Sequence, residues 1–298
     1  MANYTVTVLT ATYNRRQNLT KLYESLCRQT NKDFQWLIID DGSSDDTKQY
    51  IESLPQNGFL IEYHKKINGG KHTALNYSHL FIKGQLVFMV DSDDFIIDTA
   101  IEKINNEWIN YRTRLDIGVL SFRKQIINGK VLSAEVHEPF IDDDISYRVN
   151  NNINGDRCEV IRSDLFKKYP LPEFDGEKFM GEGWLFRNIA YNYKTVYLNE
   201  ALYICEYLEN GLSKNGRLLR MKCPYGMMEN CKSFFVPQVC KKQQIKQTIA
   251  FWTYGFCAGI SNKEIVKRSG KGNFIYIFFP MGKMLFLFWK KKYGFRGV

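Results

Sequence analysis

Short apolar runs alternate with amphipathic segments along the first hundred residues. Apolar, β-branched runs at 4–10, 34–39, 59–63 and 86–90 predict strands, whereas leucines at helical spacing predict a helix over 18–29. Segments 47–54 and 71–82 predict two further helices. Strands separated by helices usually pair in parallel, with helices on both faces of the sheet. We therefore expect an α/β fold built on a Rossmann-like, mixed but mainly parallel sheet.

The pattern changes after residue 100. Residues 118–123 and 125–127 are strand-like, 142–157 form a polar loop, and 182–193 predict a helix. Two or three basic helices are expected after Ser213. We therefore divide the chain into residues 1–213, with halves 1–100 and 101–213, and an extension over 214–298.

Composition indicates a folded protein. The chain has 298 residues and 44% apolar content, enough to bury a full core. Residues 1–4 lead straight into an apolar run, so we expect no signal peptide and a cytoplasmic location. None of the seven cysteines is spaced as C-x-x-C, which indicates reduced thiols rather than disulfides or a zinc site.

Charge is distributed unevenly along the chain. Residues 1–213 carry 24 basic and 30 acidic residues, whereas residues 214–298 carry 17 basic and two acidic residues. Such asymmetry predicts an anionic partner for the extension. Nucleic acid is not expected, because no recognised nucleic-acid-binding fold accompanies the charge.

The end of the extension is aromatic and apolar. Residues 274–289 are interrupted by Pro280 and Lys283, and the run is shorter than the roughly 20 apolar residues needed to span a bilayer. Three lysines, Lys290 to Lys292, follow it. Apolar bulk next to positive charge predicts that residues 271–298 lie on the inner face of the cytoplasmic membrane. The alternative is a helix that packs on the rest of the protein.

An acidic cluster directly follows the apolar run at 86–90. Asp91, Asp93 and Asp94 repel one another at one strand end unless a cation sits among them. A hard divalent ion with oxygen ligands, completed by substrate phosphates, fits this arrangement. The alternative is that these residues cap the next helix, which begins near Thr99.

Two further polar segments follow predicted strands. Asp40 and Asp41 precede Gly42 and Ser43, where a carboxylate can bind a nucleobase or ribose, or simply cap a turn. The segment 68–71, Asn-Gly-Gly-Lys, supplies backbone amides and a cation before a helix, a suitable place for phosphate oxygens. Asn-Gly-Gly is also a common turn.

Together these segments resemble the ordered signature of family 2 glycosyltransferases, which have the GT-A fold. The matching segments are Thr-Ala-Thr-Tyr-Asn at 10–14, Ile-Asp-Asp-Gly-Ser at 39–43, Asn-Gly-Gly at 68–70 with Ala74 and Asn76, and Asp-Ser-Asp-Asp at 91–94. The resemblance implies an inverting, metal-dependent enzyme that uses Mn²⁺ or Mg²⁺ and a nucleotide-sugar donor, mostly uridine-linked. Residues 1–100 are then the nucleotide-sugar-binding half, and 101–213 the acceptor half.

The resemblance also implies roles for single residues. The backbone of Ala11, the ring of Tyr13 and the carboxylate of Asp41 are expected at the nucleobase, Asp91 near the ribose, and Asp93 on the metal.

Four more residues complete the expected donor site. They are Asn68, Gly69 and Ser92, together with Lys71, which we expect to contact phosphate oxygens on physical grounds.

An inverting transfer requires one base that deprotonates the acceptor hydroxyl. The family usually supplies it from a Glu-Asp pair at a helix start, and here the matching residues are Glu182 and Gly183, so the aspartate is absent. We assign Glu182 as the catalytic base, beside Trp184, whose ring can stack on a sugar. The alternative is an acidic first-turn residue stabilised by the helix dipole. Glu177 and Asp175 are the other acidic candidates on the acceptor side.

The sequence is compatible with three functions. The first is a glycosyltransferase that acts on a saccharide acceptor, possibly lipid-linked, in surface polysaccharide synthesis. The second is a sugar nucleotidyltransferase, although its glycines after the first strand are missing. The third is a catalytically silent relative that binds a nucleotide sugar or a membrane, which the missing aspartate suggests.

Overall fold

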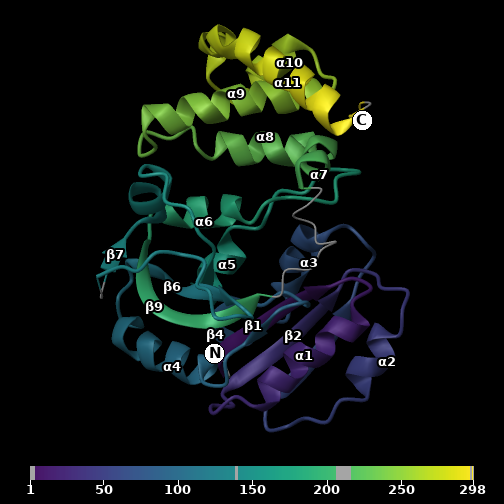
Figure 1. The fold of residues 1–298 in the computed structure, drawn as a ribbon, viewed down its shortest axis with the longest axis vertical. Coiled ribbons are helices and arrows are strands. Elements are labelled where there is room, and N and C mark those ends of the chain that lie inside the picture. Colours follow the sequence, from purple (N-terminus) through teal and green to yellow (C-terminus); the bar gives the residue numbers. More distant parts are fainter. Residues whose placement is uncertain (1–3, 138–139, 206–215, 296, 298) are drawn as a thin grey trace.

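A computed structural model describes residues 4–137, 140–205, 216–295 and 297 (Figure 1). Nine strands within these residues form one sheet, in the order β3-β2-β1-β4-β8-β6-β9-β5, with β7 paired to β9. The strands are β1 (Tyr4–Thr12), β2 (Phe34–Asp40), β3 (Leu60–Lys65), β4 (Gly84–Met89), β5 (Phe95–Ile96), β6 (Ile117–Ile126), β7 (Phe140–Asp142), β8 (Arg157–Arg162) and β9 (Lys194–Cys205). Strands β1 to β4 are parallel, whereas β8 runs antiparallel between β4 and β6. The expected mixed, mainly parallel sheet is therefore confirmed.

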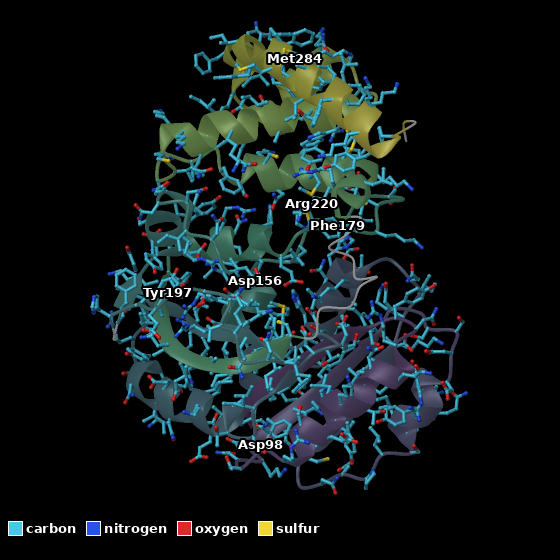
Figure 2. All side chains as sticks on the ribbon, in the orientation of Figure 1. Asp98, Asp156, Phe179, Tyr197, Arg220 and Met284 are labelled. Carbon is cyan, nitrogen blue, oxygen red and sulfur yellow. The ribbon has the colours of Figure 1, made fainter. Side chains whose placement is uncertain are left out.

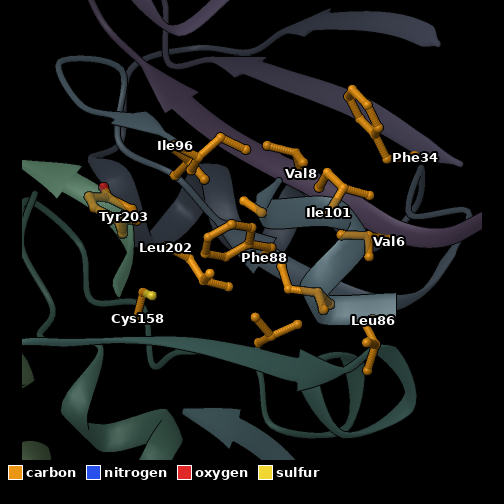
Figure 3. Close-up of a cluster of buried hydrophobic side chains, with 14 of the residues drawn as sticks. Val6, Val8, Phe34, Leu86, Phe88, Ile96, Ile101, Cys158, Leu202 and Tyr203 are labelled. Carbon is orange, nitrogen blue, oxygen red and sulfur yellow. The ribbon is translucent and has the colours of Figure 1, made fainter. Parts of the chain in front are cut away.

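Helices cover both faces of this sheet. Side chains of α1 (Arg16–Cys27), α2 (Thr47–Glu52) and α4 (Ala100–Tyr111) join one core cluster. Those of α3 (Lys71–Ser78), α5 (Ser163–Lys168) and α6 (Gly183–Ala190) join the other. Successive strand residues point to opposite faces, so Phe88 lies in the first cluster and Val87 in the second. Figure 3 shows the first cluster, where Val6, Val8 and Leu86 lie around Phe88.

The extension is a separate helical layer with its own core. It contains α7 (Gly216–Lys222), α8 (Pro224–Lys232), α9 (Lys241–Cys257), α10 (Asn262–Ser269), a 3-10 helix η2 (Gly272–Phe278) and α11 (Phe279–Tyr293). Figure 1 shows α8 nearest the sheet, α9 beyond it, and α10 and α11 outermost. Trp252 and Phe251 of α9 are fully buried in this core with Trp289 of α11.

Several expectations about element bounds were wrong. Five α-helices, not two or three, follow residue 215 in the described chain, since Pro224 starts a new helix and Gly270 ends another. The two strand-like segments after residue 118 are one strand, β6. The polar loop at 142–157 contains a π-helix, η1 (Ile145–Val149). The boundary at Ser213 lies outside the described residues and stays a prediction.

The length of the last helical stretch was also underestimated. Pro280 stands in the first turn of α11. Backbone N–H groups have no partner within the helix at this position, so the N–H that proline lacks is not missed and the helix is not interrupted. Among the described residues one stretch of 22 residues, Gly272–Tyr293, is long and apolar enough by length and composition to cross a membrane, with a mean hydropathy of 1.2 over an 18-residue window.

Candidate functional site

The carboxyl ends of four neighbouring parallel strands bring the candidate residues together. β1 pairs with β2 and β4, and β2 pairs with β3, all in parallel. The segments 11–14, 40–43, 66–70 and 91–94 therefore lie at one edge of the sheet, as expected. Tyr13 is half-exposed at this edge, and Ala11 lies opposite Ile39 in the strand register.

Asp41 organises the loop that leads into α3. Its carboxylate accepts hydrogen bonds from the backbone amides of Gly69 (3.0 Å) and Gly70 (2.7 Å), and from the Asn68 side chain (3.1 Å). Lys66 Nζ forms an ion pair with it at 2.8 Å. This network fixes the loop. The Asp41 side chain is only 5% exposed, so little of its carboxylate is accessible at the sheet edge.

Gly70 is required by the shape of this loop. Its φ is +97°, a conformation that side chains rarely adopt, and a Cβ here would lie 2.1 Å from the carbonyl oxygen of Lys178. Lys178 Nζ also donates to Asn68 Oδ1 at 2.6 Å. The loop is therefore packed against the segment that precedes Glu182.

Asp40 serves the turn rather than a ligand. Its carboxylate accepts hydrogen bonds from the Ser43 amide (2.7 Å) and the Tyr63 hydroxyl (2.6 Å). The next turn is tied to the end of β1, because the Asn14 amide donates to Ser43 Oγ (2.8 Å) and the Ser44 amide to Asn14 Oδ1 (2.8 Å). These bonds hold the segments that carry Tyr13 and Asp41 side by side.

The acidic turn at 91–94 is held by Tyr203 of β9. The Tyr203 hydroxyl accepts a hydrogen bond from the Asp91 amide (2.9 Å) and donates to Asp94 Oδ2 (2.8 Å). Ser92 and Asp94 are buried, whereas the side chains of Asp91 and Asp93 are 40% and 27% exposed. Asp91 and Asp93 are therefore the two carboxylates of this turn that a ligand can reach.

Two basic side chains balance these carboxylates. Arg15 Nη1 lies 2.9 Å from Asp93 Oδ2. Lys71, the first residue of α3, forms a close ion pair with Asp91 and a second one with Glu182 Oε1 at 2.7 Å. The cluster is thus an ionic network, and not an isolated group of like charges.

The protonation states in this network follow from burial and charge. Burial opposes the charge of Lys71, but Asp91 and Glu182 outweigh this effect and raise its pKa above the usual value. Burial also favours the neutral acid of Asp91, yet Lys71 and Lys124 outweigh it and lower that pKa. For Lys124 of β6, burial is likewise outweighed by Asp91, and its pKa is raised. At neutral pH Asp91, Lys71 and Lys124 are therefore charged.

The acceptor-side candidates lie at three different places. Glu182 is the N-cap residue of α6 and is linked to Asp91 at the sheet edge through Lys71. Trp184 is partly buried against the second core cluster. Glu177 is buried, and its carboxylate accepts the backbone amides of Tyr225 (2.7 Å) and Gly226 (2.7 Å) at the start of α8. Its role in acceptor binding stays a prediction, while its role as a helix cap is visible.

A divalent metal fits this site only together with a substrate. No group of three or more His, Cys, Asp or Glu residues that could hold a metal ion exists among the described residues. Magnesium-type ions are commonly held by one or two carboxylates plus substrate phosphates. Asp93, with Asp91 beside it, offers such carboxylates at the sheet edge.

Several residues of the site were missed by sequence reasoning. Tyr203 and Lys124 come from β9 and β6, and only the pairing of these strands brings them to the acidic turn. Lys66 and Arg15 stand close in sequence to Asn68 and Tyr13, so their nearness to recognised motifs was the available signal.

Comparison with known structures defines the class of fold. The chain superimposes on residues 1–349 of TarS from S. aureus, crystallised with UDP-GlcNAc, with a TM-score of 0.65. Sequence identity is 15%, and the match covers 97% of this chain and 92% of that chain. The fold is therefore of the GT-A type, with the helical extension included in the match.

Sequence comparison defines the family. The model of glycosyl transferase family 2 matches residues 7–169, which is more than half of the chain, and the chain belongs to this family. The glycosyltransferase GlyA of Streptococcus pneumoniae is 24% identical over 70% of this chain and 31% of that protein. A Campylobacter jejuni protein, GalNAc(5)-diNAcBac-PP-undecaprenol beta-1,3-glucosyltransferase, is 26% identical over 70% of this chain and 69% of its own length.

The lengths of the relatives differ from that of this chain. Its alignments span between 13% and 35% of GlyA and two further relatives.

Proposed function

We propose that this protein transfers a sugar from a uridine diphosphate donor to a saccharide hydroxyl in bacterial polysaccharide synthesis, with inversion at the anomeric carbon. The observation that carries this proposal is the position of Lys71 between Asp91 and Glu182. Asp91, expected at the donor, and Glu182, expected at the acceptor, thus both pair with the ammonium group of Lys71.

Uridine diphosphate is the proposed donor class for two reasons. The four segments of the family signature meet at the sheet edge, where ligands of open α/β sheets bind. The TarS structure with the same fold contains UDP-GlcNAc. In this proposal Tyr13, Ala11 and Asp41 hold the uracil, Asp91 the ribose, and Lys71, beside the loop at Asn68 and Gly69, the phosphate oxygens.

The proposed reaction is a single displacement. The Glu182 carboxylate takes the proton of the acceptor hydroxyl while its oxygen forms a bond to the anomeric carbon. The bond from that carbon to the diphosphate breaks, and UDP leaves with the electron pair. Lys71 and Arg15 place positive charge beside the region where this negative charge develops.

A divalent cation would complete the donor site. Asp93 would hold the Mn²⁺ or Mg²⁺, whose contribution is to neutralise charge on the leaving diphosphate. Arg15 pairs with Asp93 at 2.9 Å, so this arginine would have to move when the cation binds.

We further propose that the acceptor is lipid-linked and that the protein binds the cytoplasmic membrane. The name of the Campylobacter jejuni relative includes a saccharide on PP-undecaprenol. Met284, Leu287 and Phe288 of α11 are largely exposed, and Lys290–Lys292 follow them. Figure 2 shows Met284 at the end of the molecule opposite Asp98. An outer helix with apolar bulk and lysines suits an anionic lipid surface.

Incubation with Mn²⁺ and a panel of nucleotide sugars tests the enzymatic proposal. We expect hydrolysis or transfer from a uridine diphosphate sugar, and loss of that activity with a chelator. Asp93→Asn should remove the metal dependence of nucleotide binding, whereas Asp98→Asn, an exposed carboxylate paired with Arg28, should not. Release of pyrophosphate would instead indicate a nucleotidyltransferase, and binding without turnover a silent relative.

A further inference from the structure

A cavity of about 310 Å³ lies between the sheet and the extension. Strands β6, β8 and β9 line it on one side, and η1, α6 and α9 on the others. In Figure 1 α6 lies between the sheet and the helices α8 and α9. The volume is at the lower end of the range of about 300–1,000 Å³ that is typical of small-molecule sites, and suits a single sugar-sized group.

Arg187 of α6 is the buried cation of this cavity. It is only 8% exposed. Its Nε donates to Ser233 Oγ at 2.7 Å, and its Nη2 bonds to Asn230 Oδ1, so both partners are neutral. No carboxylate of the described residues lies within ion-pair distance of it, and burial lowers its pKa to about 10, although Tyr191 and Asp144 act in the opposite direction. A buried charge with no opposite charge in contact with it is costly unless a ligand supplies one.

Gly183 leaves the space that this guanidinium occupies. A Cβ on Gly183 would lie 2.8 Å from Arg187 Nη1, and both residues line the cavity. Arg187 Nη1 makes no hydrogen bond within the described parts of the chain. Gly183 directly follows Glu182, so the cavity adjoins the proposed base. Gly183, which stands where the family usually has an aspartate, therefore leaves room for a positively charged side chain close to Glu182.

The other charges of the cavity do not cancel that of Arg187. Arg148 lies 3.5 Å from Glu159 and 3.9 Å from Asp144, and its single positive charge balances one of these two carboxylates. Burial raises the pKa of Glu159 to about 7, which reduces its negative charge further. Lys246 of α9 is exposed and also lines the cavity. The excess charge is therefore positive.

We propose that this cavity binds the anionic group of the acceptor saccharide, a phosphate or a carboxylate, with Arg187 as its principal ligand and Lys246 at the entrance. The inference rests on the proposed function, because it specifies the acceptor class of the same transfer. Amide side chains such as Asn152 and Gln243 in the lining offer partners for sugar hydroxyls.

Equilibrium binding of three probes to the full chain tests the proposal. Glucose 6-phosphate, glucuronate and glucose differ in the anionic group and share the sugar ring. At least one anionic sugar should bind ten times or more tightly than glucose, and the tighter of the two identifies phosphate or carboxylate. Equal affinity for all three, or no binding of any, would overturn the proposal.

Variants assign the binding to this cavity. Lys246→Gln should weaken the binding of the anionic sugar about threefold, whereas Lys242→Gln, an exposed lysine of the same helix outside the cavity, should leave it unchanged. Gly183→Asp, which brings a carboxylate to Arg187, should weaken it tenfold or more. Arg187→Met, if the variant folds, should also weaken the binding of the anionic sugar tenfold or more. Anionic-sugar affinity that none of these changes lowers would place the site elsewhere.

Donor assays separate this inference from the proposed function. If uridine diphosphate sugars are turned over but no anionic sugar binds, the cavity proposal fails and the transfer stands. If the anionic sugar binds through Arg187 but no donor is bound or turned over, the proposed function fails and the cavity remains an anion site.

Discussion

Lys71 Nζ lies 2.7 Å from Glu182 Oε1 and pairs at the same time with Asp91. These two carboxylates are far apart in sequence, in the predicted halves 1–100 and 101–213. A single lysine at the start of α3 therefore joins the donor edge to the start of α6. This relationship locates the proposed base where it can act on an acceptor beside the donor.

Glu182→Gln should abolish transfer while donor binding is retained. The substitution keeps the size of the side chain but removes the proton acceptor, and loss of a general base typically costs about 10²–10⁴-fold in rate. The expected result is a decrease of this size in kcat, with a dissociation constant for UDP within about threefold of wild type.

Glu24→Gln is the matched control for this substitution, because Glu24 is exposed on α1, away from the sheet edge. Its turnover should equal that of wild type. Normal turnover in Glu182→Gln itself would show that another group accepts the proton, and Asp175 would be the next candidate.

Tyr203→Phe should weaken nucleotide binding. The phenol hydroxyl makes two hydrogen bonds to the turn at 91–94, and their removal should lower the free energy of unfolding by about 1–2 kcal/mol. Tyr23→Phe is the control, because the Tyr23 hydroxyl also makes two hydrogen bonds, to Pro55 and Asn57, on the surface. Denaturation and titration with UDP would measure both. Equal affinity in the two variants would contradict the role of Tyr203.

Replacement of Lys290–Lys292 by glutamine should release the protein from anionic vesicles. Each lysine near such a surface contributes about 1 kcal/mol, so the partition coefficient should fall by roughly 100-fold. Vesicle sedimentation measures it. Replacement of the exposed Lys21, Lys48 and Lys130 removes the same charge elsewhere and should have little effect. If both triple variants lose binding equally, net charge rather than α11 explains the attraction.

Glu159 should make stability depend on pH. Burial raises its pKa to about 7, against the effects of Arg148, Lys124 and Arg157 and with that of Asp144. Because the folded state then binds the proton more tightly than the unfolded state, its contribution to stability falls as pH rises from about 4.5 to 7. The free energy of unfolding of Glu159→Gln should therefore rise by about 3 kcal/mol relative to that of wild type between pH 4.5 and 8, measured by chemical denaturation. A constant difference between the two proteins would exclude this titration.

The sheet edge was predictable because its residues follow local rules. Apolar runs predicted β1, β2, β3 and β4, and parallel strands place the residues after their ends together. Asp41, the loop at 68–70 and the turn at 91–94 therefore met as expected. Local patterns did not indicate the ion-pair partner of each carboxylate. The pairing with Arg15 and Lys71 depends on how the loops pack in three dimensions.

Contacts over long sequence separations were not predictable. Tyr203 reaches Asp91 only because β9 pairs with β6 across the sheet. Pro280 seemed to break a helix but lies in its first turn, a distinction that depends on where the helix begins. The cation of the cavity, Arg187, is recognised only when Gly183 and Ser233 are seen beside it.

The buried carboxylate of Glu177, which caps α8, has a consequence for how the protein can be dissected. Only four residues separate it from Glu182, and between them Lys178 supports the loop at Gly70. A fragment that ends at residue 205 would retain the sheet but would lose the amides that hold Glu177. We therefore expect the extension to be part of the smallest active unit, so that a truncated enzyme should lose turnover before it loses the fold.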